Sequence, residues 1–503
     1  MTNHVESLRL QNFNVKEIYM QKKLIALAIA GLSGAAFAQS NVTVYGVADV
    51  SYDFVSGGGG TTQAGAAAAI NANPQGVSGI ASKGRVATVG SYFGLKGAED
   101  LGGGMKAVYQ IENEFDFSPT GNARQTGLAN RDSFVGLAGA FGTVAAGWLS
   151  SPHRSMAAKF DLMPGAGGSG SSMNIIGRIN TGSALNPVNA SGQTGHRFGN
   201  SSFTPTTVTS VSSSSSITTN GTAENVANNV GIIGRHAAVA YITPNFNGFV
   251  GTIAYVANET KDNAQLGSTT ATTGTYGKRD PRAWNVKFDY DNGPLSVGYS
   301  YIDIKDFGAI GGLTATAASN VTGGAGAVGG GLVQLDLSGR EAHKGHLLGA
   351  KYTFGGATTV SFMYDQIKST LQDGPTANVA ATSGGDLTIK RSSWYLGLKH
   401  SMGMHDFTVA YAKAGKNKVD VGSRPTANLD YEGGSDATQW ALRYAYNFSK
   451  RTAAYAQYAT IRNGSNASYD FGVGGTNAMG TGNGTVQAGA DPTTVSFGIR
   501  HNF

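Results

Sequence analysis

Two carboxylates with a spacing used in catalysis occur early in the chain, at Glu112 and Glu114. Residues two apart on an extended strand share a face and lie about 6–7 Å apart. Glycosidases use carboxylate pairs at such a separation. Lys106 falls on the same phase, so one face of this stretch mixes both signs of charge. The pattern favours an ionic wall over an acid–base pair.

The other residue types that carry chemistry form no catalytic constellation. His343 and His346 are three apart, so on a strand they face opposite sides and cannot share a metal ion. His400 and His405 flank a turn and are interpreted as interfacial side chains. The chain has no Cys, no His-Glu-x-x-His, no Gly-x-Ser-x-Gly and no phosphate-loop Gly-Lys-Ser/Thr. We therefore expect no enzyme activity, no cofactor and no metal site.

The elements that carry these residues are short alternating stretches, and the last one is the clearest. From Val495 to Phe503 apolar residues occupy one phase, while Arg500 and Asn502 fall on the other. A strand has a side-chain period of two, so one face is apolar and the other polar. Sixteen such stretches are predicted, at residues 42–54, 85–97, 105–117, 131–139, 143–149, 235–243, 248–258, 283–290, 295–305, 346–354, 358–368, 392–400, 406–413, 438–448, 452–462 and 493–503.

The connections between these stretches alternate between short turns and long loops. Turns occur at residues 98–104, 244–247, 291–294, 355–356, 401–404 and 447–450, whereas long loops rich in Gly, Ser, Thr and Asn lie at the other ends. The longest loop spans residues 151–234. This asymmetry is typical of a membrane barrel with short periplasmic turns and long extracellular loops. The terminal strand then needs the first strand to cover its edge, which closes the sheet.

Composition fits the same architecture. The 503 residues include 74 Gly, only 14% are charged, the mean hydropathy is −0.15, and no apolar run is long enough for a helical span. In a β-barrel half of each strand faces water, so the average hydropathy looks soluble. The net charge is +6, and the basic residues are not clustered along the chain as they would be in a nucleic-acid-binding protein.

The first apolar stretch is predicted to be a targeting signal. Residues 20–38 have a positive start at Lys22 and Lys23, an apolar run and the small-residue sequence Ala36-Phe37-Ala38. Cleavage after Ala38 leaves residues 39–503 as one domain. Residues 1–19 lie upstream of a complete signal and are interpreted as an extension that comes from the choice of start codon.

Several segments together resemble the Gram-negative trimeric porins, in particular the general porins of β-proteobacteria. The resemblance rests on residues 41–49, 93–107, 131–137, 448–458 and 498–503. It implies an all-β fold, a 16-stranded antiparallel transmembrane β-barrel with long extracellular loops, in which loop 3 (residues 151–234) folds into the lumen. It also implies three barrels per unit, a location in the outer membrane among its lipids and lipopolysaccharide, and a terminal Phe503 read by the barrel assembly machinery.

The sequence departs from the family pattern at the pore. Tyr92 stands where relatives carry an Arg, and residues 146–149 (Ala-Gly-Trp-Leu) replace a Leu-Gly-Arg-Gln segment, whereas Arg131 matches. Loop 3 lacks the usual Pro-Glu-Phe-Gly and has a Ser/Thr/Asn tract at residues 201–229. Pore width and selectivity are therefore not inherited from the resemblance.

The polar phases supply the candidate functional residues. Those predicted to line the pore are Asp49, Lys96, Lys106, Glu112, Glu114, Arg131, Lys287, Lys351, Lys399, Arg443 and Arg500. Those predicted on the constriction loop are Arg154, Lys159, Asp161, Arg178 and Arg197. A modest excess of cations predicts weak preference for anions.

The leading functional hypothesis is passive diffusion of small hydrophilic solutes and ions. A substrate-selective porin for one anion or sugar is the first alternative, since loop 3 is long and Trp148 stands near its start. A barrel enzyme, such as a phospholipase, and an adhesin that uses the long loops are weaker alternatives.

Overall fold

The computed structural model describes residues 42–59, 80–115, 117, 128–165, 168–180, 197–198, 208–211, 215–217, 234–256, 281–305, 341–371, 387–420, 432–465, 467, 469–471 and 489–503. The predicted signal peptide, the upstream extension and residues 201–207, 212–214 and 218–229 of the Ser/Thr/Asn tract lie outside them. Among the described residues no helix is long and apolar enough to cross a membrane.

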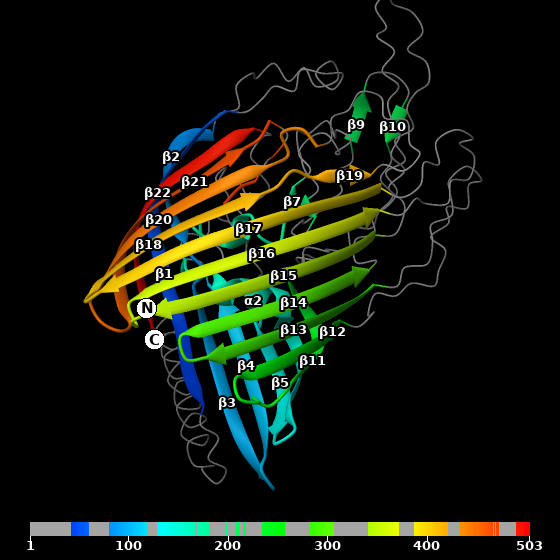
Figure 1. The fold of residues 1–503 in the computed structure, drawn as a ribbon, viewed down its shortest axis with the longest axis vertical. Helices are drawn as coiled ribbons and strands as arrows, with labels where there is room; N and C mark the ends of the chain where they lie inside the picture. The colour runs from blue at the N-terminus through cyan, green and yellow to red at the C-terminus, as the bar shows by residue number, and fades with distance from the viewer. Residues whose placement is uncertain are drawn as a thin grey trace, which may run out of the picture.

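One antiparallel sheet curls into a closed barrel (Figure 1). Its strands, in chain order, are β1 (Thr43–Gly59), β2 (Ile80–Thr88), β3 (Tyr92–Gly102), β4 (Met105–Glu114), β5 (Ser133–Gly139), β6 (Gly142–Ser150), β11 (Arg235–Ile242), β12 (Phe249–Val256), β13 (Arg282–Asn292), β14 (Leu295–Lys305), β15 (Glu341–Phe354), β16 (Thr358–Leu371), β17 (Leu387–Met402), β18 (His405–Ala414), β19 (Lys418–Asp420), β20 (Ala437–Asn447), β21 (Thr452–Asn463) and β22 (Ala490–Asn502).

Two of the crossings are interrupted strands, so these eighteen strands make sixteen crossings. β2 and β3 both pair with β1, and β18 and β19 both pair with β17. Each of the sixteen predicted stretches overlaps one crossing. The predicted barrel is therefore confirmed. Strands such as β1, β15 and β17 extend further than the alternation indicated, whereas β4, β5 and β12 are shorter.

The interruption between β2 and β3 has a local cause. Gly90 adopts a left-handed φ of 62°, which ends the extended run. The Ser91 hydroxyl replaces the missing ladder contacts, because it accepts from the Asp49 N–H at 2.8 Å and donates to the Asp49 carbonyl at 2.9 Å. The backbone of β1 therefore stays satisfied across the break.

Closure of the barrel depends on the two ends of the chain. β22 pairs with β1 from Asn502 opposite Val47 to Ala490 opposite Gly59. Beyond the strand, Phe503 exchanges two backbone hydrogen bonds with Gly46, at 3.0 and 3.1 Å. The predicted closing pair is thus present, and the sheet has no free edge at this seam.

The two faces of the sheet differ as the alternation predicted. Large apolar side chains are exposed on the outer phase, among them Phe54, Phe288, Leu348, Trp440 and Phe497. The inner phase carries polar residues together with an apolar cluster that fills one side of the barrel. That cluster joins Met156, Phe160, Met173, Ile175 and Phe471 to inward alanines of β18, β20 and β21.

Two helices and two short strand pairs complete the described elements. α2 (Pro152–Phe160) and the 3-10 helix η1 (Ser172–Asn174) follow β6. β7 (Ile179–Asn180) pairs with β8 (Arg197–Phe198), and β9 (Val208–Val211) pairs with β10 (Ser215–Ile217). All of these belong to the predicted loop 3.

Candidate functional site

The helix α2 opens the segment that narrows the barrel. Ser151 caps its first turn, since the Ser151 hydroxyl accepts from the Arg154 N–H at 3.0 Å, and Pro152 occupies the first helical position. The helix ends at Asp161, where the backbone becomes extended. Pro152, Met156 and Phe160 are buried, so the helix lies inside the barrel and not over its mouth.

Polar contacts hold α2 against β13, β15 and β16. The Lys159 ammonium donates to Asp289 at 3.0 Å and to Asp291 at 2.9 Å. At the end of the helix, Lys351 donates to the Lys159 carbonyl at 3.1 Å and Ser361 to the Phe160 carbonyl at 2.6 Å. These two contacts satisfy carbonyls that a helix end leaves without an internal partner.

A glycine makes room for the helix on the wall. A Cβ atom at Gly349 would lie 2.2 Å from the Phe160 ring. Because real Cβ atoms do not approach other carbons so closely, only glycine allows Phe160 to lie flat on β15. The depth at which α2 sits therefore depends on this position.

Asp161 organises the turn that follows α2. Its carboxylate accepts from the Met163 N–H, from the Ser172 N–H and from the hydroxyls of Ser171 and Ser172, at 2.8–3.1 Å. Burial raises the pKa of this carboxyl, and the four hydrogen bonds oppose that rise. Asp161 thus holds together the turn that follows α2.

The loop then continues along the wall to β20 and β21. Gln439 on β20 donates to the carbonyls of Ser169 and Ser171, and Gln457 on β21 donates to the Ser169 hydroxyl at 2.9 Å. Leu162 is tied to β17 through the Tyr395 hydroxyl, which accepts from its N–H at 3.0 Å. The predicted folding of loop 3 into the lumen is confirmed for these residues.

A fully buried ion pair fixes the loop on the wall between these contacts. Arg391 lies 3.5 Å from Asp365, and neither side chain has any exposed surface. Asp365 also accepts from the Gly177 N–H at 2.8 Å, while Arg391 donates to the Tyr469 hydroxyl at 2.6 Å. One pair of charges therefore anchors loop 3 and the segment around Tyr469 to β16 and β17.

The wall formed by β1, β3 and β4 carries a second charged group. Arg131 lies 3.4 Å from Glu112 and 3.9 Å from Glu114. Its guanidinium stacks on the Tyr92 ring at 4.4 Å from the centroid. The tyrosine that replaces the customary family arginine thus supports Arg131 instead of adding a charge.

A third group of charged residues lies at the seam where β1 meets the last strands of the barrel. Asp49 on β1 accepts from Arg500 at 2.9 Å and from the Tyr455 hydroxyl at 2.8 Å. Arg443 lies over the Tyr455 ring, 3.5 Å from its centroid, and donates to Gln457 at 3.3 Å. Asp49 has no exposed surface, so its charge is neutralised inside this group.

The remaining predicted residues fall in different settings. Lys287 pairs with Asp289 at 2.8 Å and Lys399 with Asp406 at 3.0 Å. Lys96 lies over the Tyr45 ring at 4.8 Å. Lys106 is exposed beside the β3–β4 turn and is separate from the charged groups above.

The other candidates of the constriction loop are equally varied. Arg178 is buried in the loop. Burial, with repulsion from Arg235 and Arg131, lowers the pKa of Arg154, although a guanidinium keeps its charge. For Arg197 the structure places only the backbone, in β8 opposite Asn180.

Sequence reasoning missed several residues of these groups. Arg235 pairs with Asp132 at 3.4 Å, and Arg85 with Asp53 at 3.5 Å. All four stand at or near the ends of predicted strands, where the phase of a side chain is hardest to assign. Asp365 shares its phase with Met363 and Ile367, so no polar alternation marked it.

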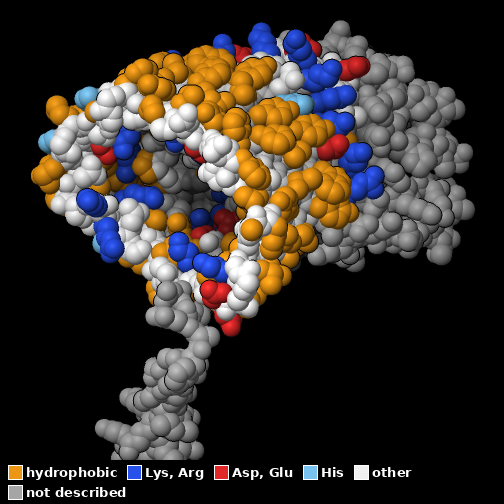
Figure 2. Space-filling model, turned by 60° about the horizontal axis from the view of Figure 1, so that its bottom comes forward, with side chains coloured by type: hydrophobic (Ala, Val, Ile, Leu, Met, Phe, Trp, Pro, Cys, Tyr) orange, Lys and Arg blue, Asp and Glu red, His pale blue; other side chains and the backbone are white. Residues whose placement is uncertain are grey.

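Seen toward its open end, the barrel has a hollow mouth with Lys and Arg on the rim and apolar side chains over the outer wall (Figure 2). A closed barrel with an apolar exterior, a charged interior and a loop folded inside is a transmembrane channel of the porin type. A family model described as Gram-negative porin matches residues 24–466. The chain belongs to this family of outer-membrane channels.

Individual relatives agree with the family. The outer membrane porin protein 32 of Delftia acidovorans is 30% identical over 485 residues, which cover 96% of this chain and 100% of that protein. The major outer membrane protein P.IB of Neisseria gonorrhoeae is 36% identical over 158 residues, 31% of this chain and 40% of its own length. The solved structure of an anion-selective porin from Comamonas acidovorans has a TM-score of 0.55 at 24% identity and covers 92% of this chain and 100% of that one.

Proposed function

We propose that the channel passes small hydrophilic solutes and ions by passive diffusion, with a weak preference for anions and without enzyme activity or a cofactor. The observation that supports this selectivity is an imbalance in the interior ion pairs. Every interior carboxylate named above except Asp161 pairs with a cation. Asp161 is instead enclosed by hydrogen bonds of the loop.

Three of the predicted cations contribute to this imbalance, which is partly offset because Glu112 and Glu114 share Arg131 and Asp161 has no cation. Lys96, Lys351 and Arg443 have no carboxylate within ion-pair distance among the described residues, and each contacts an aromatic ring, a carbonyl or an amide. Unpaired charges of one sign in a water-filled channel with low-dielectric walls raise the local concentration of counter-ions. Because the excess is small, the preference is weak.

The zero-current potential in a KCl gradient across a planar bilayer tests this proposal. We expect the sign of anion preference for the unmodified protein and a smaller potential for Lys96→Gln. Lys106→Gln is the matched control, because Lys106 lies on the same hairpin but is exposed at the turn. Cation preference, or equal effects of the two substitutions, would refute the assignment.

A substrate-selective porin for an anion is the second candidate, and a cavity supports it over a sugar channel. A space of about 170 Å³ lies below Leu162 and Pro164 of loop 3. Lys399, Arg443 and Arg500 line it with the single carboxylate Asp406. Saturable block of the KCl current by a polyvalent anion would favour this candidate, and ohmic current without block would count against it.

We propose the same oligomeric state, processing and location for this protein as the porin family has. The protein is a homotrimer in the outer membrane, in contact with its lipids and lipopolysaccharide. Residues 20–38 are its signal peptide, residues 39–503 the barrel domain, and residues 1–19 no part of the mature protein. Phe503, whose ring packs over Gly46, is the residue read by the barrel assembly machinery. Chemical cross-linking of the purified protein and sequencing of its N-terminus test the first two proposals.

A further inference from the structure

A row of lysines crosses the outer face of β15, β16, β17 and β19 at the ends that join the long loops. Lys344 on β15 lies directly opposite Lys368 on β16. Lys390 on β17 lies opposite Lys368 on one side and opposite Lys418 of β19 on the other. All four side chains are exposed, whereas the residues before and after each lysine of β15, β16 and β17 are buried. This lysine row therefore points away from the lumen.

Such a row is unfavourable until an anion covers it. Directly opposite residues of an antiparallel pair have Cβ atoms about 4.5–5.5 Å apart, and like charges at that distance destabilise the pairing. Carboxylates lie at the two ends of the row, since Asp303 is 3.9 Å from Lys344, and Asp420 and Glu432 lie beside β19. The two central lysines have a lysine on both sides across the ladder. Within the described strands, no carboxylate lies opposite either of them.

An aromatic belt fixes the level of the row in the membrane. Tyr364 lies opposite Trp394, whose ring centroid is 4.9 Å from that of Tyr411. The Tyr411 centroid is in turn 4.7 Å from that of Trp440. Such rings are enriched where hydrocarbon meets the headgroups. Lys368 stands four residues beyond Tyr364, about 13 Å further along the strand. The row therefore lies among the lipid headgroups on the long-loop side.

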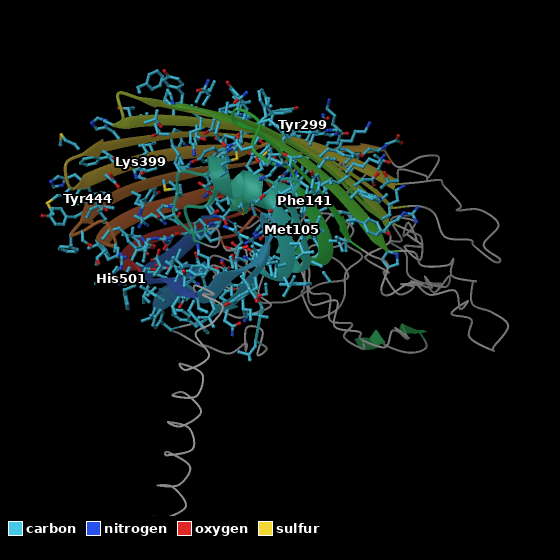
Figure 3. The ribbon with its side chains drawn as sticks, turned by 90° about the horizontal axis from the view of Figure 1, so that it is seen from below. Met105, Phe141, Tyr299, Lys399, Tyr444 and His501 are labelled. Atoms are coloured by element: carbon cyan, nitrogen blue, oxygen red, sulfur yellow. The ribbon has the colours of Figure 1, made fainter. Side chains whose placement is uncertain are left out.

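The opposite ends of β15, β16 and β17 have no outward Lys or Arg among the described residues. Their outward positions carry residues such as Phe354, Thr358 and His400. Tyr444 and His501 also lie at this short-turn end of the barrel (Figure 3). On the long-loop side, by contrast, Lys and Arg side chains gather along the edge of the apolar outer wall (Figure 2). Cations at only one boundary indicate that the leaflet on that side is the more anionic one.

We propose that the lysine row binds the phosphates of one molecule of lipid A, the membrane anchor of lipopolysaccharide. Lipid A carries a phosphate at each end of a disaccharide, so one molecule supplies several negative charges to a row about 14 Å long, or three strand spacings. Its acyl chains lie against the aromatic belt. A second copy of the barrel is a poorer occupant, because its apolar outer wall would bury the lysines without counter-charges. The inference rests on the proposed contact with lipopolysaccharide and not on ion selectivity.

Binding of lipid A to the refolded protein tests the proposal. Native mass spectrometry follows titration in dodecyl maltoside with diphosphorylated lipid A, with the same lipid without phosphates, or with inorganic phosphate. We expect one tightly held diphosphorylated lipid per barrel, and no comparable binding of the other two. The row variant, Lys368→Gln with Lys390→Gln, should bind about 30-fold more weakly, as expected for two cations near phosphates. Lys106→Gln with Lys450→Gln is the matched control, because both lysines are exposed at short turns, and should leave binding unchanged.

Heat-induced unfolding gives a second readout, which a merely structural role of the lysines would not produce. Without lipid, the row variant should unfold at the same temperature as the unmodified protein or at a higher one, because repulsive cross-strand pairs are removed. Diphosphorylated lipid A should raise the unfolding temperature of the unmodified protein and the matched control, but not that of the row variant. Added salt should reduce this gain.

The possible failures differ in what they remove. Equal binding of lipid A by the row variant and the unmodified protein would overturn the site but leave the contact with lipopolysaccharide standing, whereas no binding to either would remove both. Equal binding of lipid A with and without phosphates would also overturn the site. Dissociation of an oligomer by the row substitutions, with no lipid on the unmodified protein, would make a second copy the occupant and the proposal wrong.

Discussion

Acidification should loosen α2 from the barrel wall through His153. This side chain lies at the start of the helix with no exposed surface, and neither ring nitrogen has a hydrogen-bond partner among the described residues. Burial lowers the pKa of His153 from 6.5 to about 3, and His346 adds a small repulsion. A cation at a helix N-terminus is further disfavoured by the helix dipole.

The sign and size of the pH effect on docking follow from the difference between the pKa of buried His153 and that of an exposed imidazole. The docked helix needs neutral His153, whereas the released helix has an ordinary imidazole. Docking is therefore strongest above pH 6.5 and weakens as pH falls toward 3. Between pH 7 and 5 the free energy of docking should drop by about 2 kcal/mol, or roughly 25-fold in the opening equilibrium. Asp161 acts in the opposite direction, because burial raises its pKa and protonation then favours the docked loop.

Hydrogen–deuterium exchange of the α2 amides measures this equilibrium. Protection factors, corrected for the intrinsic pH dependence of exchange, should fall from pH 7 to 5 in the unmodified protein. The variant His153→Phe keeps an aromatic ring but cannot be protonated, so its protection factors should not fall between pH 7 and 5. They should rise if protonation of Asp161 stabilises the docked loop. An equal pH response in both proteins would show that His153 does not control docking. Single-channel records at both pH values give the functional readout.

Three further predictions concern the anchors of the loop and the seam. Asp365→Asn leaves Arg391 buried without its counter-charge and should cost about 3–5 kcal/mol, seen as a lower temperature of heat-induced unfolding on gels, while Asp365→Leu with Arg391→Met restores it. Gly349→Val should displace Phe160 and change the single-channel conductance, whereas Ala350→Val on the outer phase should not. Phe503→Ala removes the ring over Gly46 and should reduce the amount of folded barrel in membranes; an unchanged amount would refute a role in assembly.

The barrel itself was predictable because strand alternation and turn composition depend only on residues that are close together in the chain. Alternation in residues such as Val495, Phe497 and Ile499 fixes two faces, and the turns fix antiparallel order. The position of α2 was not predictable in the same way. It depends on Gly349, Lys351 and Ser361, which meet the helix only through the curvature of the sheet.

The charges of the interior show the same limit. A strand phase places Lys287 and Asp289 on one face, and the structure pairs them. It does not reveal that Asp365, which lies between apolar neighbours, pairs diagonally with Arg391 on the next strand, or that Tyr455 bridges Asp49 and Arg443. The contact between Asp49 and Tyr455 joins the first strand to one of the last, so only the closed register brings these two residues together.

The large sequence separation of the contacts at the closing seam affects how the barrel forms. The contacts of the seam join residues 406 and 451 positions apart, in the pairs Tyr455–Asp49 and Arg500–Asp49. Contacts of such high sequence separation carry a large entropy of loop closure and make folding slow. The first strand leaves its hydrogen-bonding edge and the carboxylate of Asp49 uncovered until the last strand pairs with it. A chain in transit through the periplasm must therefore be protected from aggregation for the whole time that this edge remains open.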